Sequence, residues 1–511
     1  MEKSNYLTTE NIILFSIALF KLIVLLVFAG NYGIFRDELY YLQCSNHLAL
    51  GYVDQSPLSI FILKLSTGLF GESLFGIRIL AYIASCITVF TAGIIARELG
   101  GGRFAQIASA VSVLFCGVVL GGGSYFSMNV FDVLLSTITF YFIIKLIKTD
   151  NKKLWIYIGI LFGIGLQNKL SFLFLGFGLA VALLITKQRR DLLTKELWIG
   201  AGLAVLIFLP NIIWQITNGF PTLEFMHNAS LYKNRKMSIG EFSLGSLMEL
   251  NPLNFLFILT ALYFLFFNKN GRQFITIGIM FISIFLVFVF NNGKPYYMGI
   301  LYPVILACGA VGAAVLFEKY LRLWTGYILL AILLPMYLTT VPFAIPVMNV
   351  DEFIEYSISK GVTQRNSENS ELGLLPQFFS DRFGWKEMAE QVSEIYENLP
   401  DSEKKNTIVF GQNYGEAGAI DYYRKQFDLP PVVSSHNNYW LWGYPDYADS
   451  NSTWIVIGSN FEDNSEFFEF VELAASHHSK YGMPYENVDI FICRKMKMPV
   501  EEVWKKIKHF I

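Results

Sequence analysis

The stretch that decides the fold class is residues 273–290, which read QFITIGIMFISIFLVFVF. It contains no charged side chain, and roughly 20 apolar residues in a helix cross the ~30 Å hydrocarbon core of a bilayer. Similar stretches lie on both sides of it. We predict eleven spans, at 11–30, 76–97, 103–121, 131–147, 154–167, 170–186, 196–214, 251–267, 273–290, 299–317 and 322–345. Only Asn168 and Lys169 separate the fifth from the sixth, so a re-entrant hairpin is the alternative there.

Charged side chains divide the protein into two unlike parts. Of the 511 residues, 16% are charged and 54% hydrophobic, whereas ordinary globular chains are about 25% charged. Residues 1–350 contain 15 acidic and 24 basic side chains, and residues 351–511 contain 26 and 15. This excludes a plain soluble enzyme, a coiled coil, a disordered chain and a dedicated nucleic-acid-binding protein. We predict a polytopic α-helical membrane domain at 1–350 and a soluble α/β domain at 351–511.

The basic side chains of the short loops predict the orientation. With the N-terminus in the cytoplasm, 15 lysines and arginines lie on the cytoplasmic side and 8 on the other. An odd number of spans then places the C-terminal domain outside the cytoplasm. The long loops 31–75 and 215–250 lie on that outer side too, so we expect the functional site there.

The soluble domain alternates strand and helix patterns. We predict helices at 385–399, 414–427, 465–477 and 500–511, and strands at 407–411, 431–434, 453–458 and 488–494. Three cysteines fall within predicted spans and the other two are far apart, so we expect free thiols.

Acidic residues are rare in the first part, which makes their positions informative. Asp37 and Glu38 follow the first span, and Asp132 lies just inside the outer end of the fourth. A carboxylate next to hydrocarbon is costly unless it faces a polar cavity, which favours a functional role. The alternative is that Asp132 caps its helix and Asp37 pairs with Arg36 at the surface.

A second polar group occupies the outer boundary at Lys294, Tyr296 and Tyr297, with Lys169 as a similar case. One cation and two phenols suit the binding of an anionic headgroup such as a phosphate. The alternative is an aromatic belt with snorkelling lysines, which occurs at many membrane interfaces.

Several motifs together resemble bacterial integral-membrane glycosyltransferases of the GT-C class, related to protein O-mannosyltransferases and lipid A aminoarabinose transferases (family 39-like). They are RDELYY at Arg36–Tyr41, GYVDQSPL at Gly51–Leu58, the Asp132 segment, Gly163–Lys169, GKPYY at Gly293–Tyr297, Asn413–Ala419 and Ser435–Gly443. The resemblance implies a GT-C fold in the inner membrane of a bacterium. It also implies transfer of a sugar from a polyprenyl-phosphate donor to a lipid, glycan or protein acceptor on the outer face, with inversion.

The resemblance also implies roles for individual residues. Asp37 matches the acidic residue of the family's first loop, with Glu38 beside it and Asp132 as a second acidic position. The residues expected to bind substrate are Lys294, Tyr296, Tyr297, Lys169, Tyr52, Asp54 and Gln55. Some relatives carry Glu-Lys-Pro where this chain has Asp54-Gln55-Ser56, which leaves Lys294, Lys169, Arg36 and Arg78 as the cations for the phosphate.

Three questions stay open at the level of sequence. A divalent metal at Asp54 with His47 or His227 is an alternative, although no zinc spacing or Asp-x-Asp motif is present. The aromatic residues of 436–447 either stack on acceptor sugars or pack the soluble domain onto the membrane part. A transporter or lipid flippase, and a membrane scaffold displaying the tail, are the rival classes of function.

Overall fold

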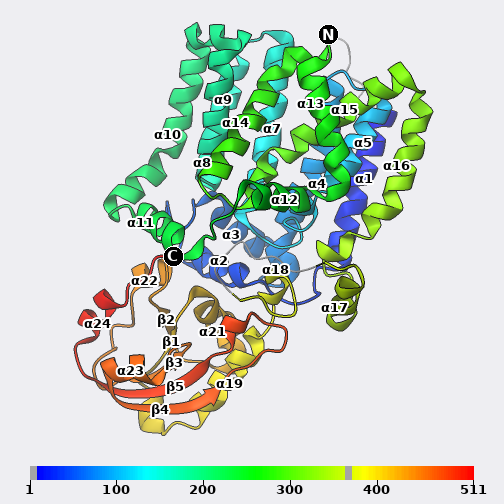
Figure 1. Cartoon of the computed structure of the whole chain (residues 1–511). Helices are drawn as coiled ribbons and strands as arrows, with labels where there is room; N and C mark the ends of the chain where they lie inside the picture. Colours follow the sequence, from blue (N-terminus) through cyan, green and yellow to red (C-terminus); the bar gives the residue numbers. More distant parts are fainter. Residues whose placement is uncertain (1–7, 363–370) are drawn as a thin grey trace.

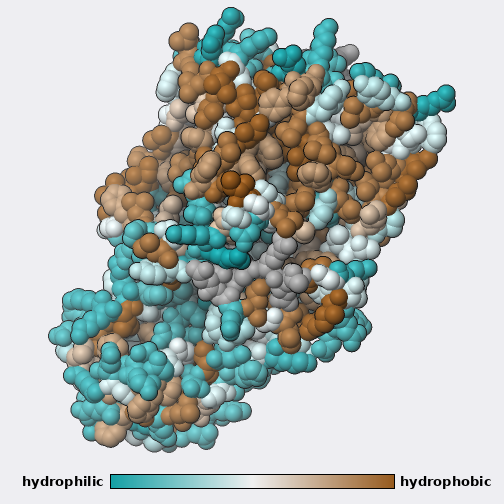
Figure 2. All heavy atoms as spheres, in the orientation of Figure 1, coloured by the Kyte–Doolittle hydropathy of each residue, from teal (hydrophilic) through white to brown (hydrophobic). Residues whose placement is uncertain are grey.

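The computed structural model describes residues 8–362 and 371–511 of the chain. A bundle of helices forms one part and an α/β domain the other, and the N-terminus lies at the end of the bundle opposite to the soluble domain (Figure 1). Hydrophobic side chains cover the visible sides of the bundle, whereas hydrophilic ones cover its far end and the soluble domain (Figure 2). This distribution is typical of a protein embedded in a bilayer.

Every predicted span overlaps a helix. The bundle consists of α1 (Thr9–Val27), α4 (Leu74–Glu98), α5 (Arg103–Leu114), α6 (Gly117–Leu120), α7 (Met128–Thr149), α8 (Leu154–Asn168), α9 (Phe172–Ile185), α10 (Lys195–Thr217), α13 (Phe255–Phe267), α14 (Ile275–Phe290), α15 (Tyr302–Tyr320) and α16 (Leu323–Leu338). Within the described ranges, six helices are long and apolar enough to cross a membrane, or up to eight if two bent pairs are single spans. The number eleven therefore stays a prediction. Lys3, one of the 15 cations predicted for the cytoplasmic side, lies outside the described residues.

Small residues allow the bundle helices to pack closely. A Cβ atom on Gly159 of α8 would lie 2.1 Å from the backbone oxygen of Gly200 in α10. Gly309 of α15 is equally close to the backbone of Phe257 in α13. Such contacts are typical of helix pairs in membranes, where close backbone approach replaces the hydrophobic effect as the source of association.

Shorter helices cover the end of the bundle that faces the soluble domain. They are α2 (Arg36–Asn46), α3 (Leu58–Phe70), α11 (Pro221–Asn228), α12 (Ile239–Leu250) and α17 (Val350–Ser359). α2, α3 and α11 lie between the bundle and the soluble domain (Figure 1). Helices of the two long loops predicted for the outer side therefore lie against the soluble domain.

The soluble domain is a five-stranded sheet with helices on both faces. Its elements are α18 (Gln377–Ser380), α19 (Trp385–Glu397), α20 (Asp401–Lys404), β1 (Thr407–Gly411), α21 (Tyr414–Phe427), β2 (Val432–Ser434), α22 (Asn438–Trp442), β3 (Thr453–Ile457), α23 (Phe461–Phe467), β4 (Phe468–Ser476), β5 (Asp489–Met496) and α24 (Val500–Lys506). The strand order is β2-β1-β3-β5-β4; β1 is parallel to β2 and β3, and β5 is antiparallel to β3 and β4.

Two predictions about this domain were wrong. Residues 465–477 are not a helix, because α23 ends at Phe467 and 468–476 pair with β5 as an edge strand. The stretch FEFVELAAS is rich in helix formers, but pairing with β5 overrides that preference. The last helix ends at Lys506 rather than 511, because the following residues extend and His509 bridges to His436.

The core of the soluble domain continues into the membrane part. Val409, Ile455 and Ile490 of one sheet face belong to the same buried apolar cluster as Leu39 of α2 and Ile77 of α4. A Cβ atom on Gly418 of α21 would lie 2.9 Å from the Cβ of Leu39. This close contact holds α2 against the soluble domain.

Candidate active site at the junction of the two domains

Glu38 is the buried anchor of helix α2. Its four hydrogen bonds come from Nε and Nη2 of Arg78 (2.7 and 2.6 Å) and from the backbone N–H groups of Phe126 (2.7 Å) and Phe35 (2.9 Å). Although burial raises the pKa of Glu38, the Arg78 guanidinium and these hydrogen bonds lower it overall. Two donors on each oxygen use both lone pairs, so this carboxylate has none left for an acceptor hydroxyl.

Asp37, the preceding residue, faces the soluble domain instead. The hydroxyl of Tyr414, at the start of α21, donates to Asp37 Oδ1 at 2.9 Å. The Arg36 guanidinium lies 4.7 Å from the centre of the Tyr414 ring. The Tyr40 ring stacks on the Tyr414 ring, with centres 4.8 Å apart. Asp37 is half-buried, unlike Glu38. Of the two neighbouring carboxylates of α2, Asp37 is therefore the more accessible.

Asp54 lies close to Asp37 at the same junction. Tyr40 donates to its Oδ1 at 3.0 Å, and the Asn437 side chain of the soluble domain approaches its Oδ2 at 3.5 Å. Burial raises the pKa of Asp54 to about 6; the Tyr40 hydrogen bond opposes this shift and the charge of Asp37 adds to it. Two carboxylates thus share one polar site, and their mutual repulsion favours a proton on one of them.

Tyr52 and Gln55 support the loop rather than face a cavity. Tyr52 is fully buried, and its hydroxyl accepts from the Ala49 N–H (3.1 Å) and donates to the Cys44 carbonyl (3.1 Å). Gln55 is 5% exposed and its Nε2 contacts the sulfur of Cys44 at 3.8 Å. The soluble domain closes over this loop, since Asn438 Oδ1 accepts from the Val53 N–H at 2.7 Å.

A second group of predicted residues meets where α7 begins and α8 ends. Lys169 Nζ donates to Asn129 Oδ1 at 2.6 Å and lies 4.8 and 5.5 Å from the ring centres of Tyr297 and Tyr296. The tyrosines belong to a 3₁₀ turn, Pro295–Ile300, that directly follows Lys294. The structure therefore brings together Lys169 and the two tyrosines, with Lys294 next to them in the chain.

Asp132 belongs to the same group but is enclosed. It is 3% exposed, and the Ser171 hydroxyl lies within 2.8 Å of both of its oxygens. The positive charge of Lys169 also acts on it. Asp132 is thus placed to hold Ser171 and Lys169 in position.

The segment Ser124–Asn129 connects the two groups. The ring centres of Tyr125 and Phe35 are 4.6 Å apart, and the charge of Asp37 acts on the Tyr125 phenol. The Phe126 N–H donates to Glu38. At the other end, Asn129 accepts from Lys169. One short segment thus contacts both the first-loop carboxylates and the Lys169 group.

Two of the four cations predicted for the phosphate are already occupied. Arg78 is fully paired with Glu38. Arg36 lies 3.5 Å from Glu486 and donates to the Tyr485 hydroxyl at 2.9 Å, so it fastens the soluble domain to α2. Lys169 and Lys294 are the two that lie beside the paired tyrosines.

The histidines suggested for a metal do not gather at Asp54. His47 stacks on Trp442 with ring centres 4.4 Å apart, and His227 is in α11. Across residues 8–362 and 371–511, no three His, Cys, Asp or Glu side chains form a group that could hold a metal ion.

The aromatic residues of 436–447 mostly pack against neighbouring side chains, within the soluble domain or at its junction with the bundle. Tyr439 is buried and donates to Asp421 at 2.8 Å, Trp440 Nε1 donates to the Trp504 carbonyl at 2.8 Å, and Trp442 stacks on His47. Packing, rather than sugar stacking, is the interpretation that this geometry favours for these three. Tyr447 is 43% exposed.

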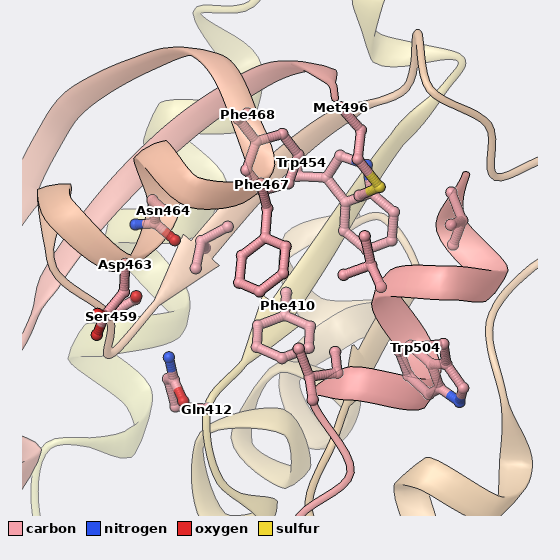
Figure 3. Close-up of a pocket in the computed structure, with 14 residues that line it drawn as sticks. Phe410, Gln412, Trp454, Ser459, Asp463, Asn464, Phe467, Phe468, Met496 and Trp504 are labelled. Atoms are coloured by element: carbon pink, nitrogen blue, oxygen red, sulfur yellow. The ribbon is translucent and has the colours of Figure 1, made fainter. Parts of the chain in front are cut away.

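A cavity in the soluble domain lies apart from this site. It encloses about 100 Å³ between the sheet and helices α23 and α24. Figure 3 shows that its wall is mainly apolar, with Phe410, Phe467 and Trp504 among its labelled residues and Gln412 and Asp463 toward one side. None of the carboxylates described above lines it, so it is not the candidate active site.

Sequence reasoning missed the residues that the soluble domain contributes. Tyr414 and Asn437 lie in Asn413–Ala419 and Ser435–Gly443, the two tail motifs quoted above, but their contacts with Asp37 and Asp54 span more than 370 residues. Arg382, discussed below, lies in no motif. Only the fold places these side chains at the membrane loops.

Comparisons with known proteins agree with this architecture. A family model described as dolichyl-phosphate-mannose-protein mannosyltransferase matches residues 54–214. The undecaprenyl phosphate-alpha-4-amino-4-deoxy-L-arabinose arabinosyl transferase of Pseudomonas paraeruginosa is 28% identical over 219 residues, which cover 39% of this chain and 38% of that protein. Its counterpart in Pseudomonas aeruginosa (strain UCBPP-PA14) is 27% identical over 178 residues, 32% of each chain. The chain thus matches about a third of the length of these curated relatives.

The likeness in structure extends much further. The crystal structure of ArnT from Cupriavidus metallidurans in the apo state has a TM-score of 0.60 and 14% sequence identity, and covers 94% of this chain and 97% of that one. The structure of the same protein bound to undecaprenyl phosphate has a TM-score of 0.59 and 13% identity over the same shares. Along nearly its whole described length, this chain has the GT-C fold of ArnT, that of a multi-pass membrane protein with a small C-terminal sheet domain.

Proposed function

We propose that the chain is a membrane glycosyltransferase that moves a sugar from a polyprenyl-phosphate donor to an acceptor at the outer membrane face. The observation that carries this proposal is the half-buried Asp37, held by Tyr414 at a junction that also presents Lys169 with two tyrosines. The curated relatives are named as transferases that use undecaprenyl phosphate arabinose, and a chain of this fold is described as bound to undecaprenyl phosphate. A base and an anion-binding group at one membrane interface are what such a transfer needs.

In this mechanism Asp37 is the general base. The acceptor hydroxyl attacks the anomeric carbon, its proton passes to Asp37, and the bond from that carbon to the phosphate oxygen breaks. Polyprenyl phosphate leaves with the electron pair, and attack from the opposite face inverts the anomeric centre. Lys169 and Lys294, with the hydroxyls of Tyr296 and Tyr297, stabilise the charge that grows on the leaving phosphate.

The other predicted residues have supporting roles in this proposal. Glu38 holds α2 through Arg78 and so positions Asp37, and Asp132 holds Ser171 and Lys169. Asp54 lies near Asp37 and orients the acceptor or the sugar, while Tyr52 and Gln55 shape its loop. None of these steps requires a resident metal.

The finer features are proposals as well. The donor is a pentosyl or hexosyl polyprenyl phosphate, and the acceptor is a membrane lipid, with a glycan or a protein as alternatives. The N-terminus lies in the cytoplasm and the soluble domain outside it, in the inner membrane of a bacterium. A transporter or flippase is supported less, because the acidic side chains gather at the junction and the fold is that of a transferase.

The test is a donor panel. Purified protein in nanodiscs is offered undecaprenyl phosphates that carry different sugars, together with membrane lipid extract, and release of undecaprenyl phosphate is measured. We expect undecaprenyl phosphate to be released at least 10-fold faster from the donor that carries one of these sugars than from the other donors. The Asp463→Asn variant, altered on the soluble domain away from the site, should match the wild type. Equal background release from every donor would contradict the proposal.

A further inference from the structure

Arg382 is a buried cation that the soluble domain inserts into the junction. It follows α18, is 4% exposed, and donates from Nε to the Phe378 carbonyl at 3.2 Å and from Nη2 to Ser124 Oγ at 3.5 Å. Its guanidinium lies 5.6 Å from the ring centre of Tyr125 and 5.8 Å from that of Phe379. Its Nη1 makes no hydrogen bond with any residue that the structure describes.

No carboxylate in residues 8–362 and 371–511 is paired with the positive charge of Arg382. Arg78 lies close by, but the charge of Glu38 is already taken by that residue. Asp381, the neighbour in sequence, accepts from Tyr485 on the side of Arg36. Among the described residues no carboxylate forms an ion pair with Arg382. Burial, together with the charge of Arg78, lowers the pKa of Arg382 to about 10, and Glu38 and the phenols of Tyr125 and Tyr82 oppose this shift.

A buried charge without a partner is costly, so a folded protein normally satisfies it. Here two guanidiniums share one carboxylate, which leaves a net positive charge at the inner wall of the junction. Arg36, a nearby cation of the same junction, does have a carboxylate partner in Glu486. The difference between the two arginines leaves the charge of Arg382 without a described carboxylate partner, and a bound anion would supply the missing negative charge.

The groups around Arg382 select the chemistry of that partner. A guanidinium presents donors in a planar fork that matches a phosphate, and the half-buried Tyr125 adds a phenol. Ser124 supplies a hydroxyl, and the charge of Asp37 also acts on Tyr125. An anion held at Arg382 would therefore lie next to the carboxylate that we assign as the base.

We propose that Arg382, with Ser124 and Tyr125, forms an anion subsite that binds a phosphate group of one of the two substrates. This inference rests on the proposed function only for the identity of the substrates. The phosphate is either that of the polyprenyl donor or one carried by the acceptor. Arg382 then supplies from the soluble domain the cation that Gln55 does not supply from the first loop.

The experiment measures phosphate binding without turnover. Full-length protein in nanodiscs is titrated with undecaprenyl phosphate, and its thermal unfolding is followed in inorganic phosphate, for the wild type, Arg382→Gln and Arg382→Lys. Arg494→Gln, which alters an arginine on the far strands of the soluble domain, is the control. A ligand that binds only the folded state raises its unfolding temperature.

We expect inorganic phosphate to raise the unfolding temperature of the wild type and of Arg494→Gln but not of Arg382→Gln, with Arg382→Lys in between. Without phosphate, Arg382→Gln should be at least as stable as the wild type, because it removes an uncompensated charge. A merely structural arginine would instead destabilise the protein when removed. If Arg382→Gln does not fold, the rise in unfolding temperature caused by phosphate is compared between the wild type and Arg382→Lys. A smaller rise for Arg382→Lys supports the inference, and an equal rise contradicts it.

Binding of undecaprenyl phosphate, together with steady-state kinetics of the same variants, distinguishes the two sources of the phosphate. Undecaprenyl phosphate bound at least 10-fold more weakly by Arg382→Gln, with a raised KM for the donor, assigns the subsite to the donor lipid. Unchanged binding of this lipid with a raised KM for the acceptor assigns it to the acceptor. The inference is overturned if neither KM changes and inorganic phosphate stabilises Arg382→Gln as much as the wild type. Binding is measured without turnover, so an inactive wild type would refute the proposed function but not this result.

Discussion

The Tyr414 hydroxyl, from the soluble domain, donates a 2.9 Å hydrogen bond to Oδ1 of Asp37, from the first loop of the membrane domain. The two residues are 377 positions apart. This bond means that the soluble domain is part of the site rather than an appendage to it. A carboxylate that accepts such a hydrogen bond is held in one orientation, and its charged form is stabilised.

Replacing Tyr414 by phenylalanine should slow the reaction without loosening the junction. A hydrogen bond to a charged group is worth about 1.5 to 3 kcal/mol, so we expect kcat to fall roughly 10- to 100-fold. The KM for the donor should stay nearly constant. The acidic limb of the pH profile of kcat should move to higher pH, because the Asp37 carboxylate loses a donor that stabilises its charged form.

The control for that variant is Tyr485→Phe, which removes a hydroxyl from the same junction that contacts Arg36 and Asp381 but not Asp37. Its pH profile should match that of the wild type. If both variants lower kcat equally and neither shifts the profile, Tyr414 acts only through packing.

The Glu38–Arg78 pair should dominate the stability of the first loop. Both side chains are fully buried, and removing one partner leaves an uncompensated charge, which costs about 3 to 5 kcal/mol. Arg78→Met should therefore lower the unfolding temperature clearly. Arg103→Met breaks the partly exposed pair with Glu10 and should cost about 1 kcal/mol or less. Equal effects of the two variants would argue against the anchoring role of Glu38.

Asp54 should make stability depend on pH in an unusual direction. Its pKa rises from 3.8 to about 6 on folding, so between these values the folded state binds more protons than the unfolded state. The contribution of Asp54 to stability is therefore greatest below pH ~4 and declines as the pH rises to ~6. The shift corresponds to roughly 2 to 3 kcal/mol.

Thermal unfolding of the wild type and Asp54→Asn from pH 4 to pH 7 checks this prediction. Asparagine cannot ionise, so the variant should gain stability relative to the wild type as the pH rises. A constant difference across the range would show that the Asp54 carboxyl titrates alike in both states.

Lys169 should affect donor binding and the chemical step together. Its ammonium lies 5.5 Å from the ring centre of Tyr296 and 4.8 Å from that of Tyr297. Lys169→Met should raise the KM for the donor about 10-fold and lower kcat, because the charge on the departing phosphate loses a partner. Lys236→Met, an exposed lysine of the 215–250 loop, should change neither value. Steady-state kinetics with varied donor concentration measures both.

Much of the membrane domain could be predicted from the sequence, because the bilayer imposes length and apolarity on each span. The Lys169 and Tyr297 group was also within reach, since polar residues at span ends stand out against apolar surroundings. The roles of Asp37 and Glu38 could not be separated in this way. They are neighbours on α2, and only the packing of α4 and α21 shows that one is buried against Arg78 and the other meets Tyr414.

The soluble domain was predictable where local pattern and tertiary pairing agree, as in β1 and α21. The prediction was wrong for β4, where helix-forming residues occupy an edge strand stabilised by β5. Arg382 gave no signal at all, because a buried and unpaired cation is defined by neighbours from distant parts of the chain.

The most direct test of the central claim is single-turnover transfer by Asp37→Asn in nanodiscs, with the preferred polyprenyl-phosphate sugar bound before the acceptor is added. Asparagine keeps the size and the Tyr414 contact but cannot take the acceptor proton. We predict that donor binding and thermal stability equal those of the wild type while the rate of transfer falls at least 1000-fold. Transfer at the wild-type rate with the donor bound normally would contradict the assignment of Asp37 as the base.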